Sequence, residues 1–283
     1  MQIIRALDQL DLSLSMLRAP GDTLALVPTM GALHDGHLAL IAEARRVADR
    51  VAATIFVNPL QFNDPKDLAR YPRTEEADLA KLQAAGCDLV WLPTPAQLYP
   101  DGFATNVSVR GVSERWEGEH RPGHFDGVAT VVAKLLLSVR PDIAIFGEKD
   151  WQQLAVIRRM ATDLSLGIGI LGHPTIREAD GLAMSSRNAL LSPESRAAAV
   201  ALPNALHAAA KEIATGGAVG PALEGAKVAL AVANFTNVDY IVLVDAGTLE
   251  PLENAREPMR LIAAASIGGV RLIDNIPVTL VQQ

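Results

Sequence analysis

Two histidines lie three residues apart in a glycine-containing turn near the start of the chain. Residues 29–37 read TMGALHDGH and follow an apolar run that ends at Pro28. A turn of this kind leads from a strand into a helix, and the backbone N–H groups at a helix start attract phosphate. Imidazole can donate to phosphoryl oxygens and can stabilise charge as it develops. His34 and His37 are therefore candidate phosphate-binding groups. A plain turn and a zinc site are the alternatives, although no further ligands at metal spacing accompany the pair.

A lysine follows a later apolar run, within residues 146–150 (FGEKD). An ammonium group at the carboxyl end of a strand can reach a nucleotide phosphate as a point charge, so Lys149 is a second candidate. Gln153 falls one turn into the next helix and can point into the same cleft. Taken alone, the segment is typical of a solvated turn.

A serine-rich loop at residues 184–188 reads MSSRN and follows a glycine-containing segment. Two hydroxyls and the Arg187 guanidinium make a suitable phosphate clamp, and such a loop can move. The alternative interpretation is an exposed polar linker between domains.

Amides and further basic side chains follow other apolar runs. Residues 58–62 (NPLQF) offer paired amide donors and acceptors for a small polar ligand, or form a plain loop. His120, Arg121 and His124 precede a helix, and we hold open whether they line the cleft or only shape the loop.

Together these motifs favour chemistry at the α-phosphate of ATP, with pyrophosphate as the leaving group. The sequence contains no G-x-x-x-x-G-K-[ST] motif, which disfavours P-loop chemistry. It contains no G-x-G-x-x-G motif either, which disfavours a dinucleotide oxidoreductase.

Short apolar runs alternate with amphipathic segments in the first part of the chain. We expect strands at residues 23–28, 51–57, 88–92, 142–146 and 168–173, and helices at 37–50, 74–85, 126–139 and 150–164. Thr74, Asp126 and Asp150 are the expected N-caps. This alternation predicts an α/β fold with a doubly wound, Rossmann-like parallel sheet. Its ligand site lies outside the carboxyl ends of the strands, where the motifs above fall.

The character of the chain changes after Arg177. Ser192 and Pro193 start an Ala-rich helix that we expect to run to about Ala214, and a second helix follows a Gly-rich break. Strands are expected at residues 238–244, 259–265 and 270–273. We therefore predict a catalytic domain at 1–176 and a smaller α+β domain at 177–283, which would act as a lid hinged near 176–180.

Composition narrows the class of protein further. The chain has 283 residues, of which 49% are hydrophobic and 20% charged, and its net charge is −7. Residues 1–177 carry −3 and residues 178–283 carry −4, so neither part attracts nucleic acid by bulk charge. Cys87 is the single cysteine, which excludes an intramolecular disulfide, and we expect it in the core. We expect no signal peptide, no membrane span and a cytoplasmic protein.

Six segments resemble, in order, the motifs of the pantothenate synthetase (pantoate–β-alanine ligase) family. They are residues 27–37 (VPTMGALHDGH), 56–62 (FVNPLQF), 71–74 (YPRT), 121–128 (RPGHFDGV), 146–153 (FGEKDWQQ) and 177–188 (READGLAMSSRN). Residues 34–37 are similar to the HxGH element of nucleotidyltransferases. Residues 184–187 are similar to the KMSKS-type loop of class I aminoacyl-tRNA synthetases, with Ser186 and Arg187 in place of its lysine-bearing end.

The resemblance implies a reaction and a set of site residues. Pantoate attacks the α-phosphorus of ATP to give pantoyl adenylate, and β-alanine then displaces AMP. The resemblance further implies Mg²⁺ with ATP, a homodimer and a cytoplasmic location. It makes His37 the catalytic residue, Gln61 and Gln153 the pantoate-binding residues, and Gln61 also a neighbour of β-alanine. The ATP-binding residues that it implies are Met30, Gly31, Ala32, Leu33, His34, Asp35, Gly36, His37, Gly147, Glu148, Lys149, Asp150, Ile176, Met184, Ser185, Ser186 and Arg187.

The expected role of His37 follows from the chemistry of the first step, and two other functions are weighed against the ligase. A carboxylate nucleophile is already ionised at neutral pH, so we expect His37 to act by hydrogen bonding and electrostatics and not as a base. An adenylyltransferase that acts on a phosphorylated precursor would need further basic residues near Gln61, and none precedes Lys66. A non-catalytic nucleotide sensor would have lost one of the charged motifs, and all are present.

Overall fold

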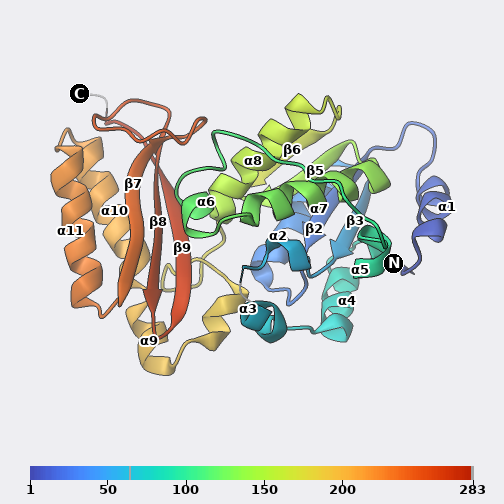
Figure 1. Cartoon of the computed structure of the whole chain (residues 1–283), viewed down its shortest axis with the longest axis horizontal. Helices are drawn as coiled ribbons and strands as arrows, with labels where there is room; N and C mark the ends of the chain where they lie inside the picture. The colour runs from blue at the N-terminus through green and yellow to red at the C-terminus, as the bar shows by residue number, and fades with distance from the viewer. Residues whose placement is uncertain (64, 282–283) are drawn as a thin grey trace.

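A six-stranded sheet forms the centre of the N-terminal part of the chain (Figure 1). The computed structural model describes residues 1–63 and 65–281. The sheet has the order β1-β4-β3-β2-β5-β6, and every pairing is parallel. Its strands are β1 (Gln2–Ile4), β2 (Leu24–Thr29), β3 (Arg50–Ile55), β4 (Leu89–Trp91), β5 (Ile143–Gly147) and β6 (Gly169–His173). The predicted doubly wound sheet is confirmed, and β1 is an additional strand at its edge.

Alternate residues of β2 pack into two separate hydrophobic layers, as expected for a strand buried on both faces. Leu24 and Leu26 join a cluster with α1 (Leu7–Leu17), α7 (His124–Val139) and α8 (Trp151–Asp163). Ala25 and Val27 join a cluster with α2 (Asp35–Val47) and α4 (Glu75–Ala84). The strand order reverses between β2 and β5, so the carboxyl ends of these two strands flank the expected ligand crevice.

Two helix starts differ from the sequence expectation. The helix that we expected from His37 begins at Asp35, with His34 in the N-cap position. The prediction of Asp126 as an N-cap is wrong, because α7 already begins at His124. Gly123, at φ +80°, turns the chain into this helix, and glycine adopts such a conformation without strain.

The C-terminal part has three helices packed against a three-stranded antiparallel sheet, in the order β7-β8-β9. These elements are α9 (Pro193–Ala198), α10 (Ala201–Ala214), α11 (Val219–Val232), β7 (Asn237–Asp245), β8 (Met259–Ile267) and β9 (Val270–Val278). The single Ala-rich helix that we expected is broken between α9 and α10. Pro203 has no N–H to donate to the carbonyl of Ala199, and its ring would clash with that carbonyl in a continuous helix.

The sheet of the C-terminal part stands between α10 and α11 on one side and the N-terminal part on the other (Figure 1). Each part has its own hydrophobic core, within residues 4–160 and 182–278 respectively. Trp151 joins the two parts, since its Nε1 donates to the carbonyl of Ala246 at 3.1 Å and the Arg260 guanidinium stacks 3.5 Å from its ring centre. The shorter helical segments are η1 (Pro59–Gln61), α3 (Pro65–Arg70), α5 (Pro95–Leu98), α6 (Glu117–His120), η2 (Glu148–Asp150) and η3 (Ser186–Leu190).

Two further expectations concern the cysteine and membrane-spanning helices. Cys87 is buried as predicted, and burial raises the pKa of its thiol to about 12, so it is not an activated nucleophile. Within the described ranges, none of the helices combines the length and the apolar character that crossing a membrane requires.

Candidate active site

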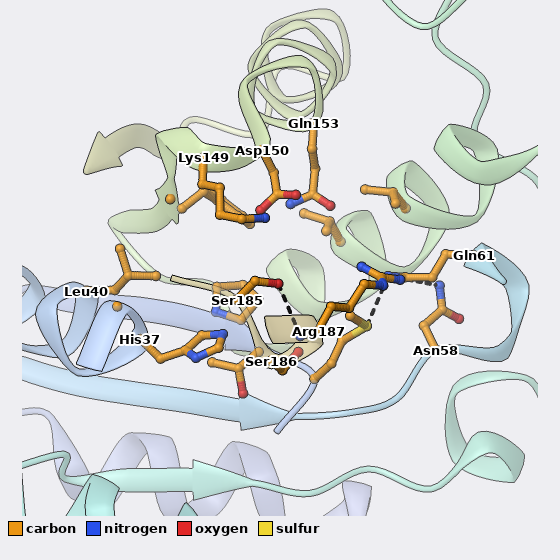
Figure 2. Close-up of a pocket in the computed structure, with 18 of the residues that line it drawn as sticks. His37, Leu40, Asn58, Gln61, Lys149, Asp150, Gln153, Ser185, Ser186 and Arg187 are labelled. Carbon is orange, nitrogen blue, oxygen red and sulfur yellow. Dashed lines mark hydrogen bonds between the residues drawn. The ribbon is translucent and has the colours of Figure 1, made fainter. Parts of the chain in front are cut away.

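A cavity of about 230 Å³ opens at the carboxyl ends of the parallel strands. In Figure 2, His37 and Lys149 lie toward one end of this cavity, and Gln61 and Asn58 lie toward the other. The structure thus brings the motifs from four separate segments of the chain around one space. The sequence-predicted site residues that line it are Met30, His34, Gly36, His37, Gln61, Gly147, Lys149, Asp150, Gln153, Ile176, Met184, Ser185, Ser186 and Arg187.

Five of the residues proposed for ATP do not line the cavity: Gly31, Ala32, Leu33, Asp35 and Glu148. The backbone N–H groups of Ala32 and Leu33 each donate to the buried carboxylate of Asp78, at 2.8 Å. These two amides are therefore not available to phosphate, contrary to our expectation for this turn. The side chain of Glu148 forms an ion pair with Arg260 at 3.1 Å.

The two histidines of the turn contact each other, with their ring centres 4.1 Å apart. The backbone N–H of His34 donates to Nδ1 of His37 at 3.3 Å. Burial, assisted by His34 and Lys149, lowers the pKa of His37 to about 3. His37 is therefore neutral near pH 7. Because its Nδ1 accepts a hydrogen bond, its proton lies on Nε2, which makes that nitrogen a donor.

The turn that carries Lys149 is fixed from the C-terminal sheet. Nδ2 of Asn275 on β9 donates to the carbonyls of Glu148 and Lys149, at 2.9 and 2.8 Å. The Lys149 ammonium itself makes no hydrogen bond or ion pair in the ranges that the structure describes. It is therefore held at the cavity wall with its charge open to a ligand.

The same strand holds the serine-rich loop. Arg177 forms a two-pronged ion pair with Asp274 of β9, at 2.7 and 2.9 Å. The N–H of Met184 donates to the carbonyl of Ile176 at 3.0 Å, which closes the loop on itself. Ser185, at the N-cap of η3, accepts a hydrogen bond from the backbone of Arg187. Two hydroxyls and a guanidinium thus line the same cavity as the histidine turn.

Gln61 is oriented through both its side chain and its main chain. Its Oε1 accepts from Nδ2 of Asn58 at 3.1 Å, and its Nε2 donates to Sδ of Met30 at 3.0 Å. Its carbonyl accepts from Nη2 of Arg121 at 3.1 Å and from Nδ1 of His124 at 2.8 Å. Arg121 and His124 also line the cavity, so both of the roles that we left open apply.

Sequence reasoning missed several residues that shape the site. Asp78 contacts the histidine turn from a helix more than forty residues away, and nothing in its surroundings marks it. Gly127 lets α7 approach η1, because a Cβ there would lie 2.3 Å from the carbonyl oxygen of Leu60. An isolated glycine within an apolar helical segment is a signal that could have identified Gly127.

Comparison with known proteins identifies the family to which this architecture belongs. The family model described as pantoate-beta-alanine ligase matches residues 2–277. The chain belongs to the pantoate–β-alanine ligase family. It is therefore an enzyme, an ATP-dependent ligase of pantothenate biosynthesis. The two alternatives that we left open, an adenylyltransferase for another precursor and a nucleotide sensor, are set aside.

Individual relatives agree with this assignment over nearly the whole length of the chain. The pantothenate synthetase of Rhizorhabdus wittichii is 57% identical over 98% of this chain and 99% of its own length. The crystal structure of pantothenate synthetase from Thermus thermophilus matches with a TM-score of 0.93 and 47% identity, covering 99% of this ligase and 100% of that chain. The ligase from Francisella tularensis, crystallised with beta-gamma ATP and beta-alanine, matches with a TM-score of 0.83 and 33% identity, covering 98% and 97%.

Proposed function

We propose that the two ends of the cavity bind the two substrates of the first reaction step. ATP lies at the end that carries His34, His37 and Lys149, with its phosphates also contacted by the loop 184–187. Pantoate lies toward the end that carries Gln61 and also contacts Gln153. This division follows the chemistry of the side chains, since cations and imidazole donors suit phosphate, and amides suit a hydroxy acid.

In this arrangement the carboxylate of pantoate attacks the α-phosphorus of ATP. A bond forms between a carboxylate oxygen and phosphorus, the bond to the bridging oxygen breaks, and pyrophosphate leaves with that electron pair. The deprotonated amine of β-alanine then attacks the acyl carbon of pantoyl adenylate. A carbon–nitrogen bond forms, the bond from that carbon to the phosphate oxygen breaks, AMP leaves with the electron pair, and the nitrogen releases a proton to solvent. Gln61 lies close to both acids in this arrangement, as the family resemblance implies. Displacement at phosphorus depends on alignment and charge neutralisation, which donors around the cavity supply.

His37 acts in the formation of pantoyl adenylate as a neutral hydrogen-bond donor. Its pKa of about 3 and the hydrogen bond at Nδ1 leave Nε2–H to donate to a phosphoryl oxygen. No general base is required, because the attacking carboxylate is already ionised. Donation to developing negative charge accounts for a catalytic role without transfer of a proton.

Mg²⁺ fits this cavity as the companion of ATP and not as a metal with its own protein cage. Asp150 is the single carboxylate among the described residues that line the cavity, and no cluster of three ligating side chains occurs in the described ranges. Mg²⁺ commonly binds through one or two carboxylates together with phosphates and water. The ion would neutralise phosphate charge, and Asp150 is the residue in place to contact it.

The observation that carries this proposal is the convergence of His37, Lys149 and Ser185 on a cavity that also contains Gln61. The test is isotope exchange between labelled pyrophosphate and ATP. With pantoate present and β-alanine absent, label should enter ATP, because adenylate formation is reversible and precedes use of the amine. Exchange that needs β-alanine would contradict the two-step path. Exchange in the absence of pantoate would contradict the proposal that the pantoate carboxylate is the nucleophile.

We extend the proposal to organisation and location. The division into residues 1–176 and 177–283 is supported by the two separate hydrophobic cores. A homodimer in the cytoplasm is what the family resemblance implies. Light scattering during size-exclusion chromatography tests the dimer, and fractionation of cells tests the location.

A further inference from the structure

A buried carboxylate lies where the C-terminal sheet meets the end of the cavity that carries Gln61, which we call the pantoate end. Glu117 of α6 is 6% exposed. Its oxygens accept hydrogen bonds from Arg271 Nη1 and Nη2 at 2.7 and 2.8 Å, and from the Tyr240 hydroxyl at 3.1 Å. Nη1 of Arg121 donates to the same carboxylate at 3.2 Å. Burial alone would raise the pKa of Glu117, but Arg271 and Arg121 outweigh it and lower the pKa to about 2.

An irregularity in β7 directs two consecutive side chains into this cluster. Val238 pairs with Ala265 and Tyr240 pairs with Ala264, so Asp239 is an extra residue in the ladder. Asp239 accepts a hydrogen bond from Nε of Arg271 at 2.6 Å, while Tyr240 reaches Glu117. Consecutive side chains of a regular strand point to opposite faces, and a bulge of this kind re-aims one of them.

The backbone at Glu117 is constrained as tightly as its side chain. The preceding residue, Trp116, has φ +55°, a backbone conformation that residues other than glycine rarely adopt. The N–H of Glu117 donates to Oε1 of Gln152 at 3.1 Å, and the next residue must be glycine-sized. A Cβ at Gly118 would lie 1.7 Å from the carbonyl oxygen of Ser113. Strained backbone that is held in place from several sides is characteristic of functional sites.

The hydrogen bonds continue from this carboxylate to the cavity. Nη1 of Arg121 contacts Glu117, and its Nη2 donates to the carbonyl of Gln61. Nε2 of His124 faces Arg121 at 3.2 Å, and Nδ1 of His124 donates to the same carbonyl. A continuous path therefore connects Arg271, through Glu117 and Arg121, to the backbone of the residue that we assign to pantoate.

We propose that Glu117 and Arg271 are positioning residues, through which the C-terminal sheet sets the geometry of the pantoate end of the cavity. The inference rests on the proposed function, because it takes Gln61 to bind pantoate. The phosphate end is held by other residues of the same strand, since Asp274 binds Arg177 and Asn275 binds the turn at Lys149. Loss of Arg271 should therefore affect the two substrates unequally.

The expected mechanism follows from sharing of the carboxylate. In the native protein Arg271 occupies one side of Glu117, and Arg121 divides its donors between Glu117 and Gln61. Without Arg271, Arg121 is the one cation, among the residues that the structure describes, left in contact with the buried carboxylate of Glu117. Pairing of both its donors with Glu117 would then withdraw Arg121 from the carbonyl of Gln61.

The test compares Arg271→Ala with Arg115→Ala. Arg115 forms an exposed ion pair with Glu250 across the same interface but has no side-chain link to Arg121 in the described part of the chain. For Arg271→Ala we expect KM for pantoate to rise by about tenfold or more, the size expected for one unmade buried hydrogen bond, with KM for ATP within about twofold. Arg115→Ala should leave both constants unchanged. An equal rise in both constants for Arg271→Ala, or no rise in either, would overturn the inference.

Two further variants separate positioning from loss of folding. Arg271→Lys keeps the charge but not the fork of two donors, so it should fold and raise KM for pantoate by a smaller factor. In a Glu117→Gln background, Arg271→Ala should have little additional effect on KM for pantoate, because the carboxylate that redirects Arg121 is gone. Independent, multiplying effects of the two substitutions would also overturn the inference.

Gln61→Ala distinguishes failure of this inference from failure of the proposed function. If Gln61→Ala raises KM for pantoate and Arg271→Ala does not, the binding assignment stands and the positioning role is wrong. If Gln61→Ala leaves KM for pantoate unchanged, the binding assignment is wrong and the inference falls with it.

Discussion

Replacing Gly127 with alanine tests whether close packing of α7 against η1 sets the geometry of the pantoate end of the cavity. A Cβ at this position would lie 2.3 Å from the carbonyl oxygen of Leu60 and 2.8 Å from the backbone nitrogen of Gln61. Ordinary contact begins near 3.4 Å, so the peptide between Leu60 and Gln61 has to move by about 1 Å. The carbonyl of Gly127 also accepts a hydrogen bond from Nδ2 of Asn58 at 3.0 Å, which the move would weaken.

The magnitudes favour a loss of both stability and pantoate binding. Alanine gains about 1 kcal/mol over glycine in helix propensity. Overpacking costs about 1–3 kcal/mol, and an unmade buried hydrogen bond at Asn58 costs about 1–3 kcal/mol more. Misplacement by about 1 Å can reduce the rate by up to about 10²-fold. We therefore expect Gly127→Ala to lower kcat/KM for pantoate by about ten- to a hundredfold and to unfold at lower denaturant concentration.

Gly225 of α11 provides the matched control, because nothing lies within 4 Å of a Cβ built there. Gly225→Ala should stabilise the protein by about 0.5–1 kcal/mol and leave the kinetics unchanged. Steady-state kinetics with each substrate varied in turn, together with urea unfolding, measure both effects. If Gly127→Ala retains kcat/KM for pantoate within twofold of the native value, close approach at this position does not set the site.

Three further predictions address the phosphate end, pH and the lid. His37→Ala and Lys149→Ala should each lower kcat by about 10²–10³, or about 3–4 kcal/mol, without unfolding, and a variant within threefold of the native rate would remove that residue from the mechanism. Burial lowers the pKa of His37 to about 3 and that of His124 to about 4, so below about pH 6.5 only the unfolded chain takes up these protons. The free energy of unfolding should therefore decrease as the pH falls from about 6.5 toward 4, and an unchanged urea midpoint between pH 7 and 5 would contradict this. ATP should protect the amides of residues 181–188 from hydrogen exchange, and Arg187→Ala should release AMP without pantothenate as free adenylate hydrolyses. Unchanged exchange together with matched products would make the loop a static part of the site.

Some of the fold and most of the cavity wall could be predicted because they depend on local pattern. The apolar runs marked five of the six parallel strands, and the motifs followed three of them directly. In any parallel sheet the carboxyl ends of the strands share one edge, so residues after those ends converge whatever the strand order. The three-residue strand β1 was not predicted, because it is too short to show a period. The break between α9 and α10 could have been predicted from Pro203, because proline interrupts a continuous helix.

Other features depended on partners distant in sequence. Asp126 was the wrong helix start because Gly123 had already turned the chain, a conformation that sequence does not display. The amides of Ala32 and Leu33 looked open to phosphate until the fold placed Asp78 against them. The low pKa of His37 results from burial, which no sequence motif specifies.

The sequence by itself determined the family, the reaction and the groups that we propose to contact phosphate, since these are encoded in short segments of fixed residue type. Only the tertiary structure decided how these groups are oriented. The contact between Glu117 and Arg271 joins residues 154 positions apart, and it reaches Gln61 through Arg121. Such contacts follow from the packing of one sheet against another part of the chain, and packing depends on all the residues of both surfaces together.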